Sequence, residues 1–140
     1  MTKKYKIVGK FIKDMSSETP DVETYLLVKD RISKYKLGVD ITSQALKDKL
    51  IEVNTILKFE EKEREGKKAF FEINFATIIK IEGEIKDKNE LEKILLCDVQ
   101  IDITPHIEKS FLDILHNSGY KGFTFEKKLD FQKLYNSRSN

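Results

Sequence analysis

Residues 69–81, Ala-Phe-Phe-Glu-Ile-Asn-Phe-Ala-Thr-Ile-Ile-Lys-Ile, carry an apolar side chain or a threonine at every odd-numbered position. A period of two is typical of a β-strand, because successive side chains point to opposite faces of a sheet. The odd-numbered side therefore predicts the core face of a strand. The other side carries Glu72 and Asn74, but also two large apolar residues, Phe70 and Ile78.

Three further segments are predicted to be strands of the same sheet. Residues 34–41 and 51–60 alternate apolar with polar side chains, whereas residues 4–14 alternate more weakly and are apolar on both sides. The charged segment 61–68 contains Gly66, a residue typical of turns, so it predicts the connection of an antiparallel hairpin. The four segments together predict a four-stranded antiparallel sheet.

Residues 14–30 have no clear period. A turn-forming run, Ser16 to Asp21, is followed by the apolar stretch Tyr25, Leu26, Leu27 and Val28. Two interpretations remain open for this segment. It is either a long functional connection with exposed apolar side chains or a connection that contains a short fifth strand.

The period changes to that of helices in the second half of the chain. Asp87 and Glu90 form a capping-box pattern, which predicts a helix beginning near Lys88. Pro105 predicts an interruption, followed by a second helix over residues 105–118. Its apolar face is expected to carry Ile107, Phe111, Ile114 and Leu115, and Asp130 is expected to cap a short terminal helical turn. The fold class is α+β, with helices packed on one face of the sheet, in a single domain over residues 1–140.

Composition excludes several classes of protein. The chain has 26 basic and 24 acidic residues, a net charge of +2 and only three arginines, which argues against nucleic-acid binding. No continuous apolar run approaches the length of a membrane span, so direct membrane insertion is not expected. The single cysteine, Cys97, allows no internal disulfide and no structural zinc site, which fits a reducing compartment.

No arrangement typical of catalysis is found in the sequence. A glycine-framed nucleophile and a phosphate-binding glycine loop are both missing. Asp102 and His106 are spaced to share a metal on one helix, but Pro105 lies between them and no third ligand is evident. We therefore expect no enzyme activity, no metal and no cofactor. A small α+β enzyme with a site at an oligomer interface is the disfavoured alternative of another class.

Two features instead favour protein binding. The apolar side chains in residues 25–28, with Phe70 and Ile78, exceed what the predicted core absorbs. Carboxylates at Asp14, Glu18 and Glu72 are expected close to them. In protein interfaces such rim charges set orientation while the apolar centre supplies affinity. The same excess of apolar surface predicts self-association.

The ordered set of motifs resembles the SecB family of protein-export chaperones. Residues 11–20, Phe-Ile-Lys-Asp-Met-Ser-Ser-Glu-Thr-Pro, are similar to the end of that family's first strand. Residues 49–59 and 70–81 resemble two later strands. The helix from Pro105 to Ser118, the pair Gly119-Tyr120 and the run Leu129-Asp130-Phe131-Gln132-Lys133-Leu134-Tyr135 resemble its helix, turn and closing motif.

The resemblance implies a cytosolic chaperone that uses neither ATP nor a cofactor. It would assemble as a homotetramer, a dimer of dimers with helices between them, hold unfolded preproteins and deliver them to the SecA motor. The resemblance implies three sets of site residues. The SecA-binding surface would be Asp14, Glu18, Phe70 and Glu72. The client groove would be lined by Tyr25, Leu26, Leu27, Ile32 and Ile78, and the oligomer interface would contain Ile107, Phe111 and Ile114. The alternative within the family is a SecB-like chaperone dedicated to a single client, such as an antitoxin.

Overall fold

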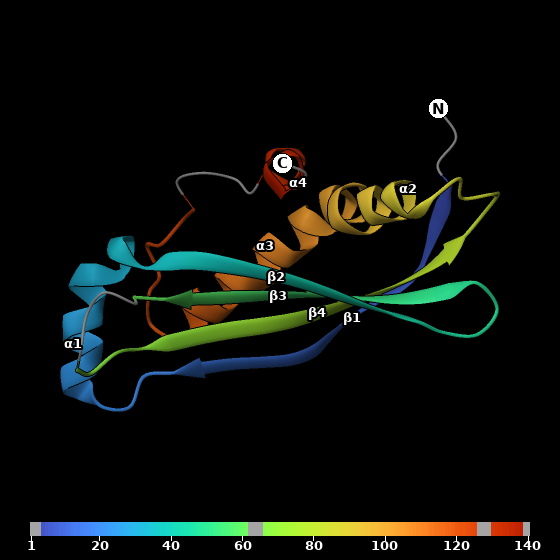
Figure 1. Cartoon of the computed structure of the whole chain (residues 1–140). Coiled ribbons are helices and arrows are strands. Elements are labelled where there is room, and N and C mark those ends of the chain that lie inside the picture. The colour runs from blue at the N-terminus through green and yellow to red at the C-terminus, as the bar shows by residue number, and fades with distance from the viewer. Residues whose placement is uncertain (1–3, 62–65, 126–129, 139–140) are drawn as a thin grey trace.

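The computed structural model describes residues 4–61, 66–125 and 130–138 (Figure 1). Four long strands come first, with one helix inserted after the first strand, and the remaining helices follow. The elements are β1 (Tyr5–Glu18), α1 (Val22–Arg31), a 3₁₀ turn (Ile32–Lys34), β2 (Lys36–Ala45), β3 (Leu50–Glu60), β4 (Phe70–Ile81), α2 (Lys88–Lys93), a π-helical turn (Ile94–Asp98), α3 (Val99–Asn117) and α4 (Phe131–Arg138).

The strands form one antiparallel sheet in the order β1-β4-β3-β2. The predicted α+β class is thus confirmed. Strand β4, which has the long apolar face, is a central strand between β1 and β3. Two register shifts in β1, between Ile7 and Gly9 and between Ile12 and Asp14, explain why this strand alternates weakly. Each bulge moves the following side chains to the other face, so apolar residues accumulate on both.

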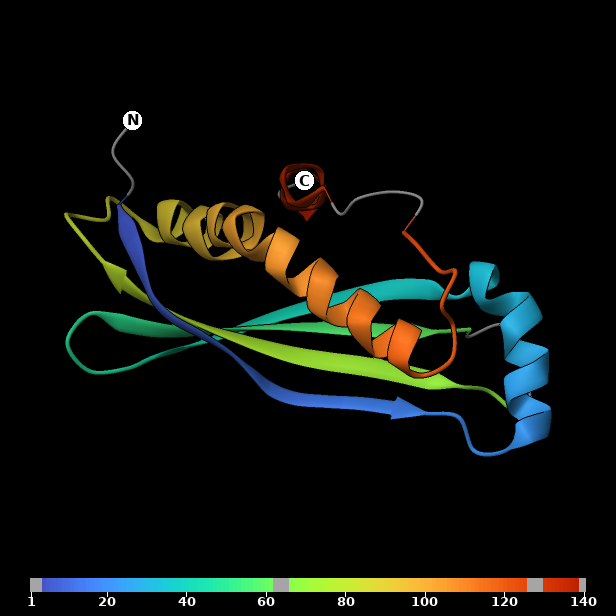
Figure 2. The same ribbon diagram turned by 180° about the vertical axis from the view of Figure 1, so that it is seen from behind.

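Helix α3 crosses one face of the sheet and closes the core (Figure 2). Ala69 and the odd-numbered side chains of β4 from Phe71 to Ile79 are fully buried beneath the helices, as predicted. Gln100 of α3 is also fully buried and joins the two layers. Its side-chain carbonyl accepts a hydrogen bond from Thr55 Oγ1 of β3 at 2.7 Å, and its amide donates to the carbonyl of Leu95 at 3.0 Å. A buried polar side chain requires such partners.

The predicted interruption at Pro105 is wrong. Helical structure runs without a gap from Lys88 to Asn117, and Pro105 lies inside α3. Thr104, the residue before the proline, does not cap a new helix, since its hydroxyl donates to the carbonyl of Gln100 in the preceding turn. An internal proline costs a backbone hydrogen bond, but the side chains on either side of it, Ile103 and Ile107, are buried against the sheet and hold the helix together. The predicted start of α2 is confirmed, since the Asp87 carboxylate accepts from the Glu90 amide at 2.9 Å.

Residues 14–30 match neither interpretation made from the sequence. Strand β1 continues to Glu18, and residues 22–31 form helix α1 across the end of the sheet (Figure 1). Asp21 caps this helix, because its Oδ1 accepts from the Thr24 amide at 2.8 Å and from the Thr24 hydroxyl at 2.7 Å. Thr24 and Val28 are the buried residues of the helix. None of the helices in the described ranges is both long and apolar enough to cross a bilayer.

Candidate functional site

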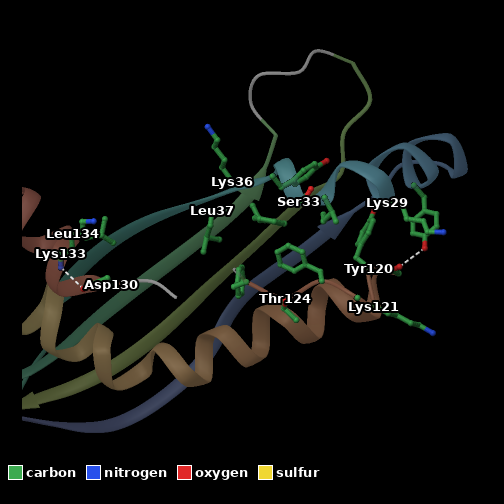
Figure 3. Close-up of a pocket in the computed structure, with 18 of the residues that line it drawn as sticks. Lys29, Ser33, Lys36, Leu37, Tyr120, Lys121, Thr124, Asp130, Lys133 and Leu134 are labelled. Carbon is green, nitrogen blue, oxygen red and sulfur yellow. Dashed lines mark hydrogen bonds between the residues drawn. The ribbon is translucent and has the colours of Figure 1, made fainter. Parts of the chain in front are cut away.

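A large open groove lies at the end of the sheet where α1 stands (Figure 3). Its walls come from α1, the start of β2, Phe59 of β3, residues 119–125 and α4. The volume is about 1650 Å³. Sites for small molecules typically measure roughly 300–1,000 Å³, so this groove is larger than such a ligand needs. Its size and shape suit an extended chain.

The floor of the groove is a cluster of aromatic rings from distant parts of the sequence. The ring of Phe59 lies 5.2 Å from that of Phe123, and Phe123 lies 5.4 Å from Phe125, centroid to centroid. Tyr25 and Tyr120 form a similar pair at 5.5 Å. Phe123 and Phe125 are only partly buried, so the groove presents aromatic surface to solvent. Such surface provides affinity for apolar side chains with little specificity.

The two tyrosines also connect α1 to the chain that follows α3. The Tyr25 hydroxyl donates to the carbonyl of Gly119 at 2.9 Å, and the Tyr120 hydroxyl lies 3.1 Å from that of Thr19. Burial raises the pKa of Tyr120, so this phenol stays protonated. These contacts hold α1 against residues 119–120 and so hold one wall of the groove in place.

The residues expected to form the client groove are not all together. Tyr25 and Ile32 line it. Leu26 and Leu27 are on the same helix but do not line it, and Leu26 is 56% exposed. Ile78 lies on the other face of the sheet, where it is paired with Gly9 of β1 and Glu52 of β3. Because β4 alternates, Ile78 cannot share a face with the buried Ile79.

Several groove residues were missed from the sequence. Phe123 and Phe125 lie between α3 and α4, outside the predicted site residues, and Leu134 belongs to the terminal helix α4. The available signal was three aromatic residues at positions 120, 123 and 125 around Gly122, a density unusual for a surface connection. Nothing in the sequence places them beside Tyr25, since that contact depends on the tertiary fold.

The residues expected to bind the motor are brought together on the face of the sheet opposite α3. In the pairing of β1 with β4, Glu18 lies beside Phe70, and Asp14 lies beside Asn74. Glu72 is between them on the same face. Its carboxylate is 3.6 Å from the Lys58 ammonium, which offsets part of the negative charge of this surface. Asp14 and Glu18 are exposed.

The residues expected at the oligomer interface lie instead in the core of the subunit. Ile107, Phe111 and Ile114 are 2%, 0% and 7% exposed, because the apolar stripe of α3 faces its own sheet. Exposed large apolar side chains are found elsewhere in the described residues, on the edge strand β1, on α3, on α1, after β2 and on α4: Val8, Phe11, Ile12 and Met15; Ile101; Val22 and Leu26; Leu46; Leu134. The largest group of these side chains on one element is on the edge strand β1, where association could bury them.

The groups considered for catalysis have other contacts. The Asp102 carboxylate accepts a hydrogen bond from the Tyr5 hydroxyl, and burial together with this bond raises the pKa of Tyr5. Burial likewise raises the pKa of the Cys97 thiol, which disfavours the reactive thiolate. His106 packs against the edge of Phe75, at 4.9 Å between ring centroids. Within residues 4–61, 66–125 and 130–138 no group of three or more potential metal ligands is found.

The fold and the groove together define a class of protein. A four-stranded antiparallel sheet with helices on one face is the architecture of a solved SecB-like chaperone. Of the solved structures, a SecB-like chaperone from Mycobacterium tuberculosis, determined with a peptide from an antitoxin, is similar with a TM-score of 0.60 at 12% sequence identity. The match covers 89% of this chain and 90% of that one, and at this identity it shows the fold alone.

The sequence comparisons identify the family. The family model described as "Preprotein translocase subunit SecB" matches residues 1–140. The putative protein-export protein SecB of Pelagibacter ubique is 56% identical over 140 residues, which is the full length of both chains. The protein-export protein SecB of Rhodospirillum centenum is 25% identical over 127 residues, covering 91% of this chain and 74% of that protein. The chain belongs to the SecB family, as the motifs in its sequence suggested.

Proposed function

We propose that this protein is a cytoplasmic export chaperone that holds unfolded preproteins in the aromatic groove and passes them to the SecA motor. The observation that supports this most directly is the groove itself, which offers about 1650 Å³ of largely apolar, open space. Large apolar surfaces that a soluble protein leaves exposed usually mark sites where another molecule binds. Membership of the SecB family supports the same function.

Client binding in this proposal is driven by apolar side chains and does not need a defined sequence. Burying one large apolar side chain contributes about 1.5–3 kcal/mol, and association costs several kcal/mol that must be offset first. A few client side chains seated on Phe123, Phe125 and Leu134 would therefore give binding that is moderate and reversible. Reversible binding is what a carrier requires, because it must release the client again.

The SecA-binding surface in this proposal is the set Asp14, Glu18, Phe70 and Glu72. It lies on the face of the sheet opposite α3, whereas Leu37 and Phe59 turn toward the groove from the helix-covered face. Client and motor would then bind on different faces. A complex of all three components is sterically possible in this arrangement, and transfer would not require the chaperone to let go of the client first.

Assembly into a homotetramer, a dimer of dimers, is also part of the proposal. The exposed apolar residues of β1 lie on an edge strand, where a second copy could cover both the side chains and the unpaired backbone groups. Ile101, 51% exposed on α3, offers a second contact. A dimer of dimers requires two kinds of interface, and these residues lie on two different elements, β1 and α3.

A comparison of two leucines tests the client groove. Leu134 lines the groove and is 50% exposed, whereas Leu26 is 56% exposed on α1 and does not line it. Light scattering measures how far the protein suppresses the aggregation of an unfolded preprotein. We expect Leu134→Ser to weaken this suppression and Leu26→Ser to leave it unchanged. Equal effects of the two substitutions, or none with either, would contradict the placement of the client in this groove.

A chaperone dedicated to one client is the second candidate, and the Mycobacterium tuberculosis neighbour with its antitoxin peptide illustrates it. Capture experiments from cytosol separate the candidates. Many secretory precursors bound in substoichiometric amounts support the export chaperone. A single stoichiometric partner, and no binding to SecA by titration, would support the dedicated chaperone instead.

A further inference from the structure

The margin of the groove is positively charged, although the chain as a whole is nearly neutral. Among the described residues, four lysines line the groove, Lys29, Lys36, Lys121 and Lys133, with one carboxylate, that of Asp130. Figure 3 shows Lys36 and Lys121 at the margins with their side chains directed outward to solvent. The lining thus has charged lysines around an aromatic floor, which is the arrangement of a protein-binding site with an apolar centre and a charged rim.

Asp130, the one carboxylate that the described part of the chain contributes to the lining, is already engaged. Asp130 Oδ1 accepts a hydrogen bond from the backbone amide of Lys133 at 3.0 Å and so caps helix α4. A carboxylate at this position stabilises the beginning of the helix. The negative charge of Asp130 therefore stabilises the start of α4, and it offsets only part of the positive charge of the groove lysines.

Within the described ranges some lysines are held by carboxylates, but three of the groove lysines are not. Lys4, Lys13, Lys67 and Lys109 each lie within ion-pair distance of a carboxylate, as does Lys58. In the part of the chain that the structure describes, the ammonium groups of Lys29, Lys121 and Lys133 make no such pair. Three cations beside an apolar groove are thus available to a bound molecule.

We propose that the groove selects extended polypeptide segments in which aromatic or aliphatic residues are flanked by aspartate or glutamate. The inference rests on the proposed function, and it adds the chemistry of the preferred client. Apolar client side chains would seat on Phe59, Phe123 and Phe125, and the flanking carboxylates would lie near Lys29, Lys121 and Lys133. Complementary rim charges speed encounter and disfavour clients with basic flanks.

The test uses the full chain and three fluorescent peptides that share one aromatic and aliphatic core. Their flanks are aspartate, serine or lysine, and binding is measured by fluorescence anisotropy. We expect the aspartate-flanked peptide to bind about tenfold more tightly than the lysine-flanked one at low ionic strength, and this ratio to shrink as salt is added. Equal affinities, or tighter binding of the lysine-flanked peptide, would overturn the inference and leave the proposed function standing.

Two triple variants of equal net charge locate the effect. We expect Lys29→Gln with Lys121→Gln and Lys133→Gln to lower the affinity for the aspartate-flanked peptide to that for the serine-flanked peptide, which itself should bind unchanged. The control variant replaces three exposed lysines at the other end of the molecule, Lys47, Lys86 and Lys88, with glutamine and should keep the preference. Loss of the preference in both variants would assign it to net charge and overturn the site.

The two proposals fail in different ways. If none of the three peptides binds, and the protein does not delay the aggregation of an unfolded preprotein, the proposed function fails, and the inference fails with it. Circular dichroism and molecular mass by light scattering should show that both triple variants keep the fold and assembly of the unmodified protein, since all six lysines are exposed.

Discussion

The hydroxyl of Tyr25 donates a hydrogen bond to the carbonyl of Gly119 at 2.9 Å, and the same tyrosine ring occupies the space that a side chain at position 119 would need. A Cβ built on Gly119 would lie 2.7 Å from Tyr25 Cε1. Gly119 also has a φ of 105°, a conformation that residues with a side chain rarely adopt. Two separate constraints therefore require glycine where α3 ends and the groove begins.

Gly119→Ala is predicted to destabilise the protein by about 1–3 kcal/mol, because it combines backbone strain with a clash against the tyrosine ring. The matched control is Gly122→Ala, since nothing lies within 4 Å of a Cβ at that position and its backbone is not in the left-handed region. The free energy of unfolding from urea titrations measures both. A Gly119 variant no less stable than the Gly122 variant would contradict this account of the contact.

Substitutions at two positions of α3 are predicted to separate folding from assembly. Phe111 is fully buried and packs against Phe59 with 6.0 Å between ring centroids, so Phe111→Asp should cost at least about 3–5 kcal/mol and unfold the subunit. Ile101 is 51% exposed, so Ile101→Asp should keep the helical circular dichroism signal and reduce the molecular mass in solution. A folded Phe111→Asp protein, or an Ile101→Asp protein of unchanged mass, would contradict the respective half of this prediction.

Glu72→Lys is predicted to weaken SecA binding without unfolding the protein. The new lysine would face Lys58, which now lies 3.6 Å from the Glu72 carboxylate, and the surface beside Phe70 would become positive. A surface substitution of this kind typically changes stability little. The control is Glu84→Lys, an equal change of charge at an exposed position outside this surface. Calorimetric titration that finds the same affinity for both variants would remove Glu72 from the proposed surface.

The cap of α1 is predicted to make the stability of the protein sensitive to acid. Hydrogen bonds from Thr24, and then from Lys67, lower the pKa of Asp21 from its ordinary value of 3.8 to about 2. A carboxyl whose pKa is lower in the folded state stabilises that state above its unfolded pKa, and this contribution is lost as pH falls toward the folded pKa. The difference in melting temperature between the unmodified protein and Asp21→Ala should thus shrink between pH 4 and pH 2.

That pH profile has its own control. Asp130→Ala removes the cap of another helix, α4, where the carboxylate accepts a hydrogen bond from the Lys133 amide at 3.0 Å. The Asp130→Ala variant should keep the same loss of stability between pH 4 and pH 2 that the Asp21 cap of α1 causes in the unmodified protein. A difference between the unmodified protein and Asp21→Ala that stays constant across this pH range would show that the charge of Asp21 does not stabilise α1.

Much of the fold could be predicted because local periodicity reports burial directly. The alternation in residues 69–81 identified the buried face of β4, and the capping pattern of Asp87 and Glu90 located the start of α2. Two predictions failed where a local signal competed with packing. Pro105 is locally a helix breaker, but burial of Ile103 and Ile107 on either side of it keeps α3 continuous. The cap formed by Asp21 was overlooked because the apolar run after it resembled a strand.

The site could be predicted only in part. The acidic set on β1 and β4 follows from strand register, because paired residues on one face are neighbours wherever the strands meet. Tyr25 and Ile32 were expected in the groove and line it, whereas Ile78 was expected there and lies on the opposite face. Phe123 and Phe125 had no local pattern that could reveal their role.

The order of polar and apolar residues along the chain determined the sheet, its buried face and most helix positions, because each depends on neighbours a few residues apart. The tertiary structure alone decided which distant segments meet. Tyr25, Phe59 and Phe123 share one groove because α1 and the chain after α3 close over the same end of the sheet. It likewise decided that the apolar stripe of α3 is used within the subunit, since burial against its own sheet leaves Ile101 as the exposed large apolar residue of that helix.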